Sequence, residues 1–212
     1  MKPRRNSDNR KYKAILKAAI TLFLKHGYSK TSMDAIAKEA GVTKQTVYAH
    51  YHSKDMLFTE IVSELCKKHA PSKSLCTGKE PDIECMLIKF GMSFLNMLTS
   101  KEGLATVRLV IAESRAHPKL AQRYYESGSR RMLSIVAEFL EQQNQLGNLH
   151  IPAPLSAASY FFSMLKGTYY VRILFNIKPL PSPHEKEVHV RESVRIFMRI
   201  YGGSNPMHTH ST

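Results

Sequence analysis

The stretch TSMDAIAKEAGVTKQTVYAHYHSK, residues 31–54, decides the fold of this chain. Its first part carries apolar residues at three- and four-residue intervals, namely Met33, Ile36, Ala37 and Ala40. This spacing predicts a short helix with one buried face, and Thr31 and Ser32 can cap its first turn. Gly41 then supplies the left-handed backbone conformation that commonly ends a helix.

A second short helix is predicted directly after this glycine. Thr43 can cap it, and its inward face needs only Val47 and Tyr51. The other side chains are hydrogen-bonding groups: Lys44, Gln45, Thr46, Tyr48 and His50. A helix of about two turns with so little apolar surface has no packing reason to exist by itself. Two helices joined by a tight glycine turn, the second polar and basic, are typical of helix-turn-helix proteins that place a recognition helix in the major groove.

These residues resemble the DNA-binding domain of the TetR family of one-component bacterial transcriptional regulators. The resemblance covers residues 11–57 and is carried by four motifs: AxxLFxxxGY at 19–28, TSMDAIAxxAGV at 31–42, TVYxHY at 46–51 and SKxxLF at 53–58. Tyr51 stands where relatives often have Phe, which keeps an aromatic ring. The alternative is an ordinary helix-glycine-helix corner, but such a corner does not require Tyr48, His50 and Lys54 together.

The charge of the chain also favours a polyanionic partner. The 212 residues carry a formal net charge of +14. Residues 1–70 hold 14 Lys and Arg against 6 Asp and Glu, and the remaining residues hold 17 against 11. A basic N-terminal third suits DNA, because neutralising phosphates releases counterions. Charge alone does not distinguish between these partners, because an anionic membrane surface attracts a basic protein as DNA does.

Several protein classes are disfavoured by the composition. No run of 18 or more apolar residues occurs, so no membrane span is expected. Residues 14–24 are interrupted by Lys17, which indicates an amphipathic helix rather than a signal peptide. The three cysteines, Cys66, Cys76 and Cys85, lack metal-type spacing and are expected to be free thiols. We therefore expect a cytoplasmic protein with no membrane partner.

Periodicity predicts helices along the rest of the chain. A first helix from Arg10 to His26 supports the helix pair, and the charged end 1–9 before it is expected to be mobile. Whether the arginines of that end contact DNA or stay solvated is left open. Further helices are expected at residues 53–69, 82–98, 103–116, 118–147, 155–175 and 185–201. Gly128 would weaken the helix at 118–147 near its middle.

The predicted fold class is all-α with two domains. The turn-rich segment APSKSLCTGKEP, residues 70–81, marks the boundary. Residues 1–70 form a three-helix helix-turn-helix domain with a linking helix, and residues 71–212 form a larger helical domain for ligand binding and dimerisation. Within the latter, IAESRAHPKLAQRYYESG at 111–128 and SYFFSMLKG at 159–167 resemble the regulatory domain of AefR-like members of the TetR family.

The resemblance implies a homodimer that binds double-stranded operator DNA. A palindromic operator needs two recognition helices, and the family pairs its subunits through the last two long helices. The helix at 155–175 is apolar on nearly all sides, so it must be buried on more than one face. The alternative is a central helix of a monomeric bundle.

The expected DNA contacts lie on and around the helix pair. Tyr48 and His50 match family positions that touch phosphates, and Lys54 matches another at the start of the fourth helix. Lys44, Gln45 and Thr46 are the candidates for base edges, because Lys pairs with guanine and Gln with adenine. Thr31 and Ser32 would anchor phosphates. The full predicted set is Thr31, Ser32, Met33, Thr43, Lys44, Gln45, Thr46, Tyr48, His50 and Lys54.

Family resemblance also implies a small-molecule effector in the helical domain. Met and aromatic residues would suit an adaptable apolar site, although core packing is the commoner role for each of them. The candidates are Phe90, Phe94, Met97, Leu109, Tyr124, Phe139, Phe162 and Tyr169. Ligand binding would bias one of two separations of the DNA-binding domains.

The sequence offers no catalytic constellation, so we expect no enzyme activity, cofactor or metal. No HExxH, GxSxG or phosphate-cradling glycine loop is present, and the HxH at His208 and His210 lies in the C-terminal tail. Two functions remain. The first is a sequence-specific transcriptional regulator, most often a repressor in this family. The second is a basic helical protein that coats nucleic acid or an anionic membrane without reading sequence.

Overall fold

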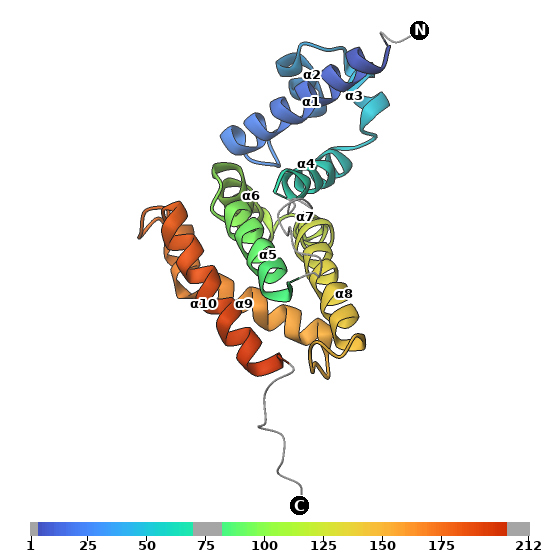
Figure 1. Ribbon diagram of the computed structural model, residues 1–212. Helices are drawn as coiled ribbons and strands as arrows, with labels where there is room; N and C mark the ends of the chain where they lie inside the picture. The colour runs from blue at the N-terminus through green and yellow to red at the C-terminus, as the bar shows by residue number, and fades with distance from the viewer. Residues whose placement is uncertain (1–3, 70–81, 203–212) are drawn as a thin grey trace, which may run out of the picture. The chain divides into compact units, whose positions relative to one another are not determined.

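The computed structural model describes residues 4–69 and 82–202, and it confirms the all-α fold class (Figure 1). The elements are α1 (Arg4–His26), α2 (Met33–Ala40), α3 (Lys44–His50), α4 (Lys54–Lys68), α5 (Ile83–Leu98), α6 (Lys101–Glu113), α7 (Pro118–Tyr124), a π-helical turn (Tyr125–Arg130), α8 (Arg131–Gln145), α9 (Pro154–Leu174) and α10 (Pro183–Tyr201). No helix among the described residues is long and apolar enough to cross a bilayer.

These helices form two compact units. The first contains residues 1–67 and 101–129, and the second contains residues 68–100 and 130–212. By their contacts, helices α6 and α7 therefore belong to the same unit as the N-terminal helices, whereas the sequence predicts them in the C-terminal domain. The boundary predicted at 70–81 lies outside the described residues, as does Cys76, whereas Cys66 and Cys85 are described and are both half-buried.

The first unit contains the predicted helix pair. Ser32 caps α2 by accepting a hydrogen bond from the backbone N–H of Ala35, and Gly41 ends the helix in the left-handed conformation with φ of 65°. Thr43 caps α3 in the same way through the N–H of Thr46. The core beneath the pair is formed mainly by Ile15, Ala19, Phe23, Ile36, Val47, Leu57 and Phe58, all with almost no exposed surface.

Two helices differ in extent or continuity from the prediction. Helix α1 begins at Arg4 rather than Arg10, because the polar segment between them contains neither Gly nor Pro and continues the helix. The helix predicted at 118–147 is divided by the π-helical turn around Gly128. A Cβ on Gly128 would lie 3.1 Å from Cγ1 of Val62, so the absent side chain lets this turn approach α4.

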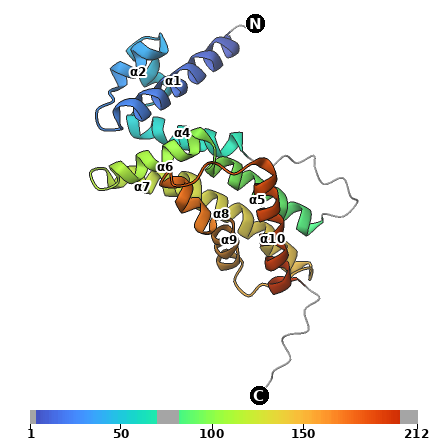
Figure 2. The same cartoon turned by 90° about the vertical axis from the view of Figure 1, so that its left-hand side faces the viewer.

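The second unit is built around α9 and α10. Helix α9 packs against α8, α10 and α5, and α5 also packs along α10 (Figures 1 and 2). Its most deeply buried side chains include Leu87, Leu95, Leu140, Phe161, Leu165, Val190 and Phe197. Gly91 of α5 allows the closest approach, because a Cβ there would lie 2.7 Å from Cγ1 of Val190 and 3.2 Å from Cδ2 of Leu165.

Helix α9 is not the continuous helix that the sequence predicts at 155–175. Gly167 has φ of 49° and ψ of −169°, which are not helical values. Apolar periodicity carries no signal for such a break, since the hydrophobic residues continue on both sides of it. Only glycine adopts this backbone conformation without strain.

We predict that Gly91→Ala lowers the free energy of unfolding by about 1–2 kcal/mol. The added methyl group overpacks the contact with Val190, and this cost exceeds the gain of about 1 kcal/mol in helix propensity. Urea unfolding followed by circular dichroism measures the change. In a Val190→Ala background, which removes the clashing methyl groups, the same substitution should cost less, and an equal cost in both backgrounds would contradict this packing account.

Candidate nucleic-acid interface

The surface of α3 presents most of its polar side chains to solvent. Val47 is its one fully buried residue, and Tyr51, directly after the helix, packs inward against Tyr12 with ring centroids 5.9 Å apart. Lys44, Gln45 and Tyr48 are exposed, whereas Thr46 and His50 are half-buried. The helix is thus held to the core by one face, and the other face is available to a partner.

Lys44 is restrained although it is exposed. Its Nζ lies 2.9 Å from the Asp34 carboxylate on α2, and it also lies 5.9 Å from the centre of the Tyr48 ring. The hydrogen bond to Asp34 raises the pKa of Lys44, so the ammonium stays charged. Gln45 makes no hydrogen bond through its amide among the described residues. Gln45 is therefore the side chain most free to meet a base edge.

At the start of α2, the side chains of Thr31, Ser32 and Met33 are already used within the protein, although they were predicted to contact DNA. The Thr31 hydroxyl is buried and donates to the carbonyl oxygens of Gly27, at 2.8 Å, and Leu22, at 3.2 Å. Met33 is buried in the core, and Ser32 is exposed but occupied as the N-cap. A phosphate contact from Met33 would therefore come from its backbone N–H at the helix start, whereas the N–H of Thr31 donates to the carbonyl oxygen of Tyr28 at 3.3 Å.

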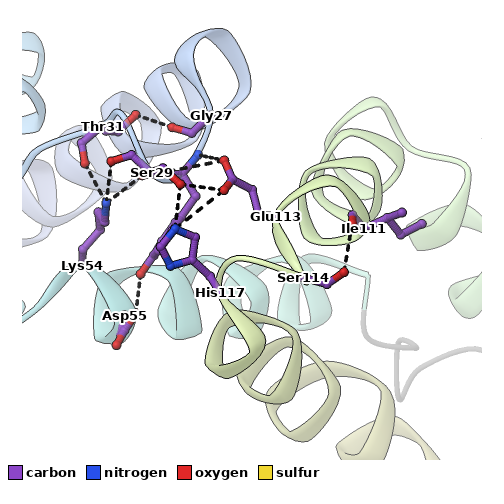
Figure 3. Close-up of polar contacts among 10 residues, drawn as sticks. Gly27, Ser29, Thr31, Lys54, Asp55, Ile111, Glu113, Ser114 and His117 are labelled. Atoms are coloured by element: carbon purple, nitrogen blue, oxygen red, sulfur yellow. Dashed lines mark hydrogen bonds and ion pairs between the residues drawn. The ribbon is translucent and has the colours of Figure 1, made fainter.

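Lys54 is placed beneath the turn that joins α1 to α2 (Figure 3). Its Nζ donates to the carbonyl oxygens of Tyr28 at 2.7 Å, Thr31 at 3.0 Å and Ser29 at 3.4 Å, and it lies 4.3 Å from the centre of the Tyr28 ring. Burial lowers the pKa of this lysine. A DNA phosphate that contacted Lys54 would have to share an ammonium proton that already binds a carbonyl oxygen.

Residues at the junction of α6 and α7 hold the same turn from the other side. Glu113 Oε1 accepts the backbone N–H of Tyr28 at 2.9 Å, and its Oε2 accepts the Ser29 hydroxyl at 2.7 Å. His117 Nε2 lies 2.6 Å from Ser29 Oγ (Figure 3). The hydrogen bonds from Ser29 lower the pKa of Glu113. Neither Glu113 nor His117 is in the set of site residues predicted from the sequence.

A buried tyrosine completes this polar cluster. The Tyr28 hydroxyl donates to the Asp55 carboxylate, and Arg123 of α7 lies 3.8 Å from the same carboxylate. Burial, followed by the hydrogen bond to Asp55, raises the pKa of Tyr28, so its hydroxyl remains a donor at neutral pH. The start of α4 is therefore bound to the turn by two neighbouring residues, Lys54 and Asp55.

The eight candidate ligand residues do not all lie in one unit. Leu109 and Tyr124 belong to the first unit, where both pack against its core. The other six belong to the second unit, and two ring pairs stand out among them. Phe94 and Phe162 have ring centroids 4.5 Å apart, and Phe90 and Phe139 have centroids 5.5 Å apart. His208 and His210 lie outside the described residues.

Two family models match the chain over most of its length. The model of bacterial regulatory proteins of the tetR family matches residues 15–61, and the model of the AefR-like transcriptional repressor C-terminal domain matches residues 85–203. The second match covers more than half of the chain.

Solved structures and curated sequences give the same result. The structure of a TetR-family transcriptional regulator from Mesorhizobium loti MAFF303099 is 30% identical, with a TM-score of 0.72 over 92% of this chain and 98% of that one. The flavonoid-responsive regulator FrrA is also 30% identical, with a TM-score of 0.73 over 92% of this chain and 99% of its own. The HTH-type transcriptional regulator YhgD of Bacillus subtilis strain 168 is 27% identical over 82% of this chain and 88% of its own.

We predict that Glu113→Gln lowers the free energy of unfolding by about 1 kcal/mol at pH 7, since hydrogen bonds to a carboxylate are stronger than those to an amide. The folded-state pKa of Glu113 lies below the ordinary value of 4.5. Its stabilisation is therefore complete above pH 4.5 and is lost as the pH falls through the folded-state value.

Urea unfolding at pH 7 and at progressively lower pH measures this effect. The difference between the wild type and Glu113→Gln should shrink as the solution is acidified. Glu39→Gln, at an exposed position of α2 in the same unit, is the matched control and should change stability little at any pH. A difference that stays constant with pH would show that the Glu113 charge does not stabilise the turn.

Proposed function

Because the chain belongs to the TetR family of bacterial transcriptional regulators, we propose that it binds a palindromic operator as a homodimer and is released by a small apolar ligand. Transcriptional regulators of this family are DNA-binding helix-turn-helix proteins, and the AefR-like match is to repressors. The operator symmetry, the dimer and the release by ligand are the parts that experiments must establish.

The observation that carries this proposal is the construction of α3. The helix is capped by Thr43 and buries a single side chain, Val47, so its exposed face has no role in the core. Gln45 offers both an amide donor and an amide acceptor, which can pair with N7 and N6 of adenine. Lys44 can reach guanine when it leaves Asp34, and Tyr48 and His50 flank these residues as phosphate partners.

The proposed interface is completed by four residues around the start of α2, namely Thr31, Ser32, Met33 and Lys54. The N-terminal N–H groups of α2 supply positive partial charge where an operator phosphate would lie. Lys54 supports them from below, because it fixes the turn from which α2 begins. We therefore assign these residues to phosphate anchoring, which sets position and affinity rather than sequence.

Selection of bound duplexes from a random DNA pool tests the function directly. We predict a palindromic consensus, and Gln45→Ala should relax the preference at one base pair of each half-site by about 1–3 kcal/mol. Glu39→Ala, on the exposed face of α2, is the control and should select the wild-type consensus. If no consensus emerged from the wild type, a protein that coats nucleic acid without reading sequence would be the better account.

The dimer is proposed through α9 and α10 because both helices expose large apolar side chains. These are Leu155, Tyr160 and Val171 on α9 and Val188, Ile196 and Ile200 on α10. Tyr160 is 59% exposed and Ile200 is 54% exposed, although the opposite faces of both helices are buried in the core. Apolar surface on two adjacent helices is typical of a protein interface.

We predict that Tyr160→Arg combined with Ile196→Arg converts the dimer into a monomer, because an unpaired charge in an apolar interface costs several kcal/mol. Sedimentation equilibrium measures the mass. Leu146→Arg, at a 68% exposed position after α8, is the control and should remain dimeric. A double variant that still sediments as a dimer would place the interface elsewhere.

For the effector, the second unit offers the ring pairs of Phe90 with Phe139 and Phe94 with Phe162. Aromatic side chains with an adjacent methionine, Met97, form an adaptable apolar environment. The similar regulator FrrA is flavonoid-responsive by name, which favours a flat aromatic effector for this chain. The effector could shift the equilibrium between the two states of the protein only by the difference between its binding free energies for them.

A further inference from the structure

A cavity in the second unit lies where the end of α9, the following loop and the first turns of α10 meet. Its volume is about 300 Å³, at the lower end for small-molecule sites, and its lining includes Tyr169, Ile173, Lys178, Leu180, Lys186 and His189. We propose that this cavity binds a small aromatic carboxylate. Of the eight predicted effector residues this site uses only Tyr169 and none of the four paired phenylalanines, so it goes beyond the proposed effector site.

The break in α9 shapes one wall of the cavity. Gly167 turns the backbone so that Tyr169 and His189 meet edge to face, with ring centroids 5.0 Å apart and an interplanar angle of 80°. His189 Nε2 donates to the carbonyl oxygen of Leu165 at 3.0 Å. This hydrogen bond fixes the imidazole ring, so the aromatic wall is in place before a ligand arrives.

The remaining walls favour a flat apolar molecule. Ile173 is buried beneath the cavity, and the loop contributes Pro179, Leu180 and Pro181. Proline rings and an aromatic edge present flat surfaces with fixed geometry, which an aromatic ring can contact with little loss of conformational entropy. A cavity of this volume fits a single-ring compound rather than a larger fused-ring system.

The charges around the cavity favour an anion. Lys178 and Lys186 both line it, and neither ammonium is within ion-pair distance of a carboxylate among the described residues. Lys186 Nζ donates to Asn96 Oδ1 at 2.7 Å, which places the cation without neutralising it. The two cations lie beside the N-terminal end of α10, where the helix dipole is positive. Together they would stabilise a negatively charged group bound in the cavity.

The one carboxylate at the cavity is already occupied. Glu185 Oε2 accepts the backbone N–H of Ser182 at 2.8 Å, and Ser182 Oγ accepts the backbone N–H of Glu185 at 3.2 Å, which together form a capping box. These bonds, with a smaller contribution from Lys178, lower the pKa of Glu185. The carboxylate keeps its negative charge, so the two lysines leave the cavity lining with one net positive charge.

One polar group of a lining residue, the Tyr169 hydroxyl, is enclosed by the protein. It is buried and has no hydrogen-bond partner among the described residues. Burial raises the pKa of Tyr169 to about 12, so the hydroxyl keeps its proton at neutral pH. An unsatisfied buried hydroxyl is unfavourable, but almost none of this oxygen's surface is accessible, so a ligand could accept its hydrogen bond only if the Tyr169 ring turned the oxygen toward the cavity.

Calorimetric titration of the full-length protein with cinnamate tests the proposal. We expect saturable binding, weakened about tenfold or more by Lys178→Gln combined with Lys186→Gln, because two charge-assisted contacts are lost. Lys166→Gln combined with Arg172→Gln removes the same charge from exposed positions of α9 and should leave the affinity unchanged. Cinnamyl alcohol, which keeps the ring but lacks the charge, should bind about tenfold more weakly.

A second measurement locates the ligand. In proton NMR of the same titration, one histidine resonance should shift, and that resonance should be absent from His189→Gln. Absence of binding, or binding that the Lys178 and Lys186 variant retains, would overturn the proposal. Because no DNA is present in either experiment, such a result would leave the proposed operator binding unaffected, and failure to select an operator would leave this cavity proposal unaffected.

Discussion

The turn between α1 and α2 is the point on which the DNA-binding unit depends. Its backbone carbonyl groups accept three hydrogen bonds from the Lys54 ammonium, and its N–H groups donate to the Glu113 carboxylate. Backbone polar groups removed from water must be satisfied, and charged partners satisfy them most strongly. The short helices α2 and α3 inherit their position from this turn, because neither buries enough surface to position itself.

Glycine has two roles in this fold. At some positions it lets two elements approach closely, and at another it lets the backbone turn. Gly91 brings α5 against α10, and Gly128 brings the π-helical turn against α4. Gly167 instead interrupts α9 and creates the aromatic corner with His189. In the first two cases the missing side chain makes room for a neighbour. In the third, the backbone conformation itself requires glycine.

The sequence predicts the helix-turn-helix well because its signals are local. Caps at Ser32 and Thr43 and the left-handed Gly41 act within a few residues of where they stand, and apolar spacing reports the buried face directly. The polar cluster could not be predicted in this way. Ser29 and Glu113 are separated by 84 residues, and nothing in the spacing of either segment indicates that they meet.

Other features were missed because their cause is tertiary packing. The break at Gly167 lies within an uninterrupted apolar pattern, and the grouping of α6 and α7 with the N-terminal helices depends on contacts that no local pattern encodes. Thr31 and Lys54 have the chemistry of phosphate ligands, but their polar atoms are used within the protein.

The ion pair between Lys44 and Asp34 gives the unbound protein an internal competitor for DNA. Before Lys44 can contact a base or phosphate it must leave a carboxylate 2.9 Å away, so DNA gains only the difference between two attractions. Dissolved salt weakens both attractions together, which partly cancels its effect on the exchange. In the interface that we propose, this lysine would therefore add less to non-specific DNA binding than its charge suggests, and it would favour sites whose geometry compensates for the loss of the ion pair.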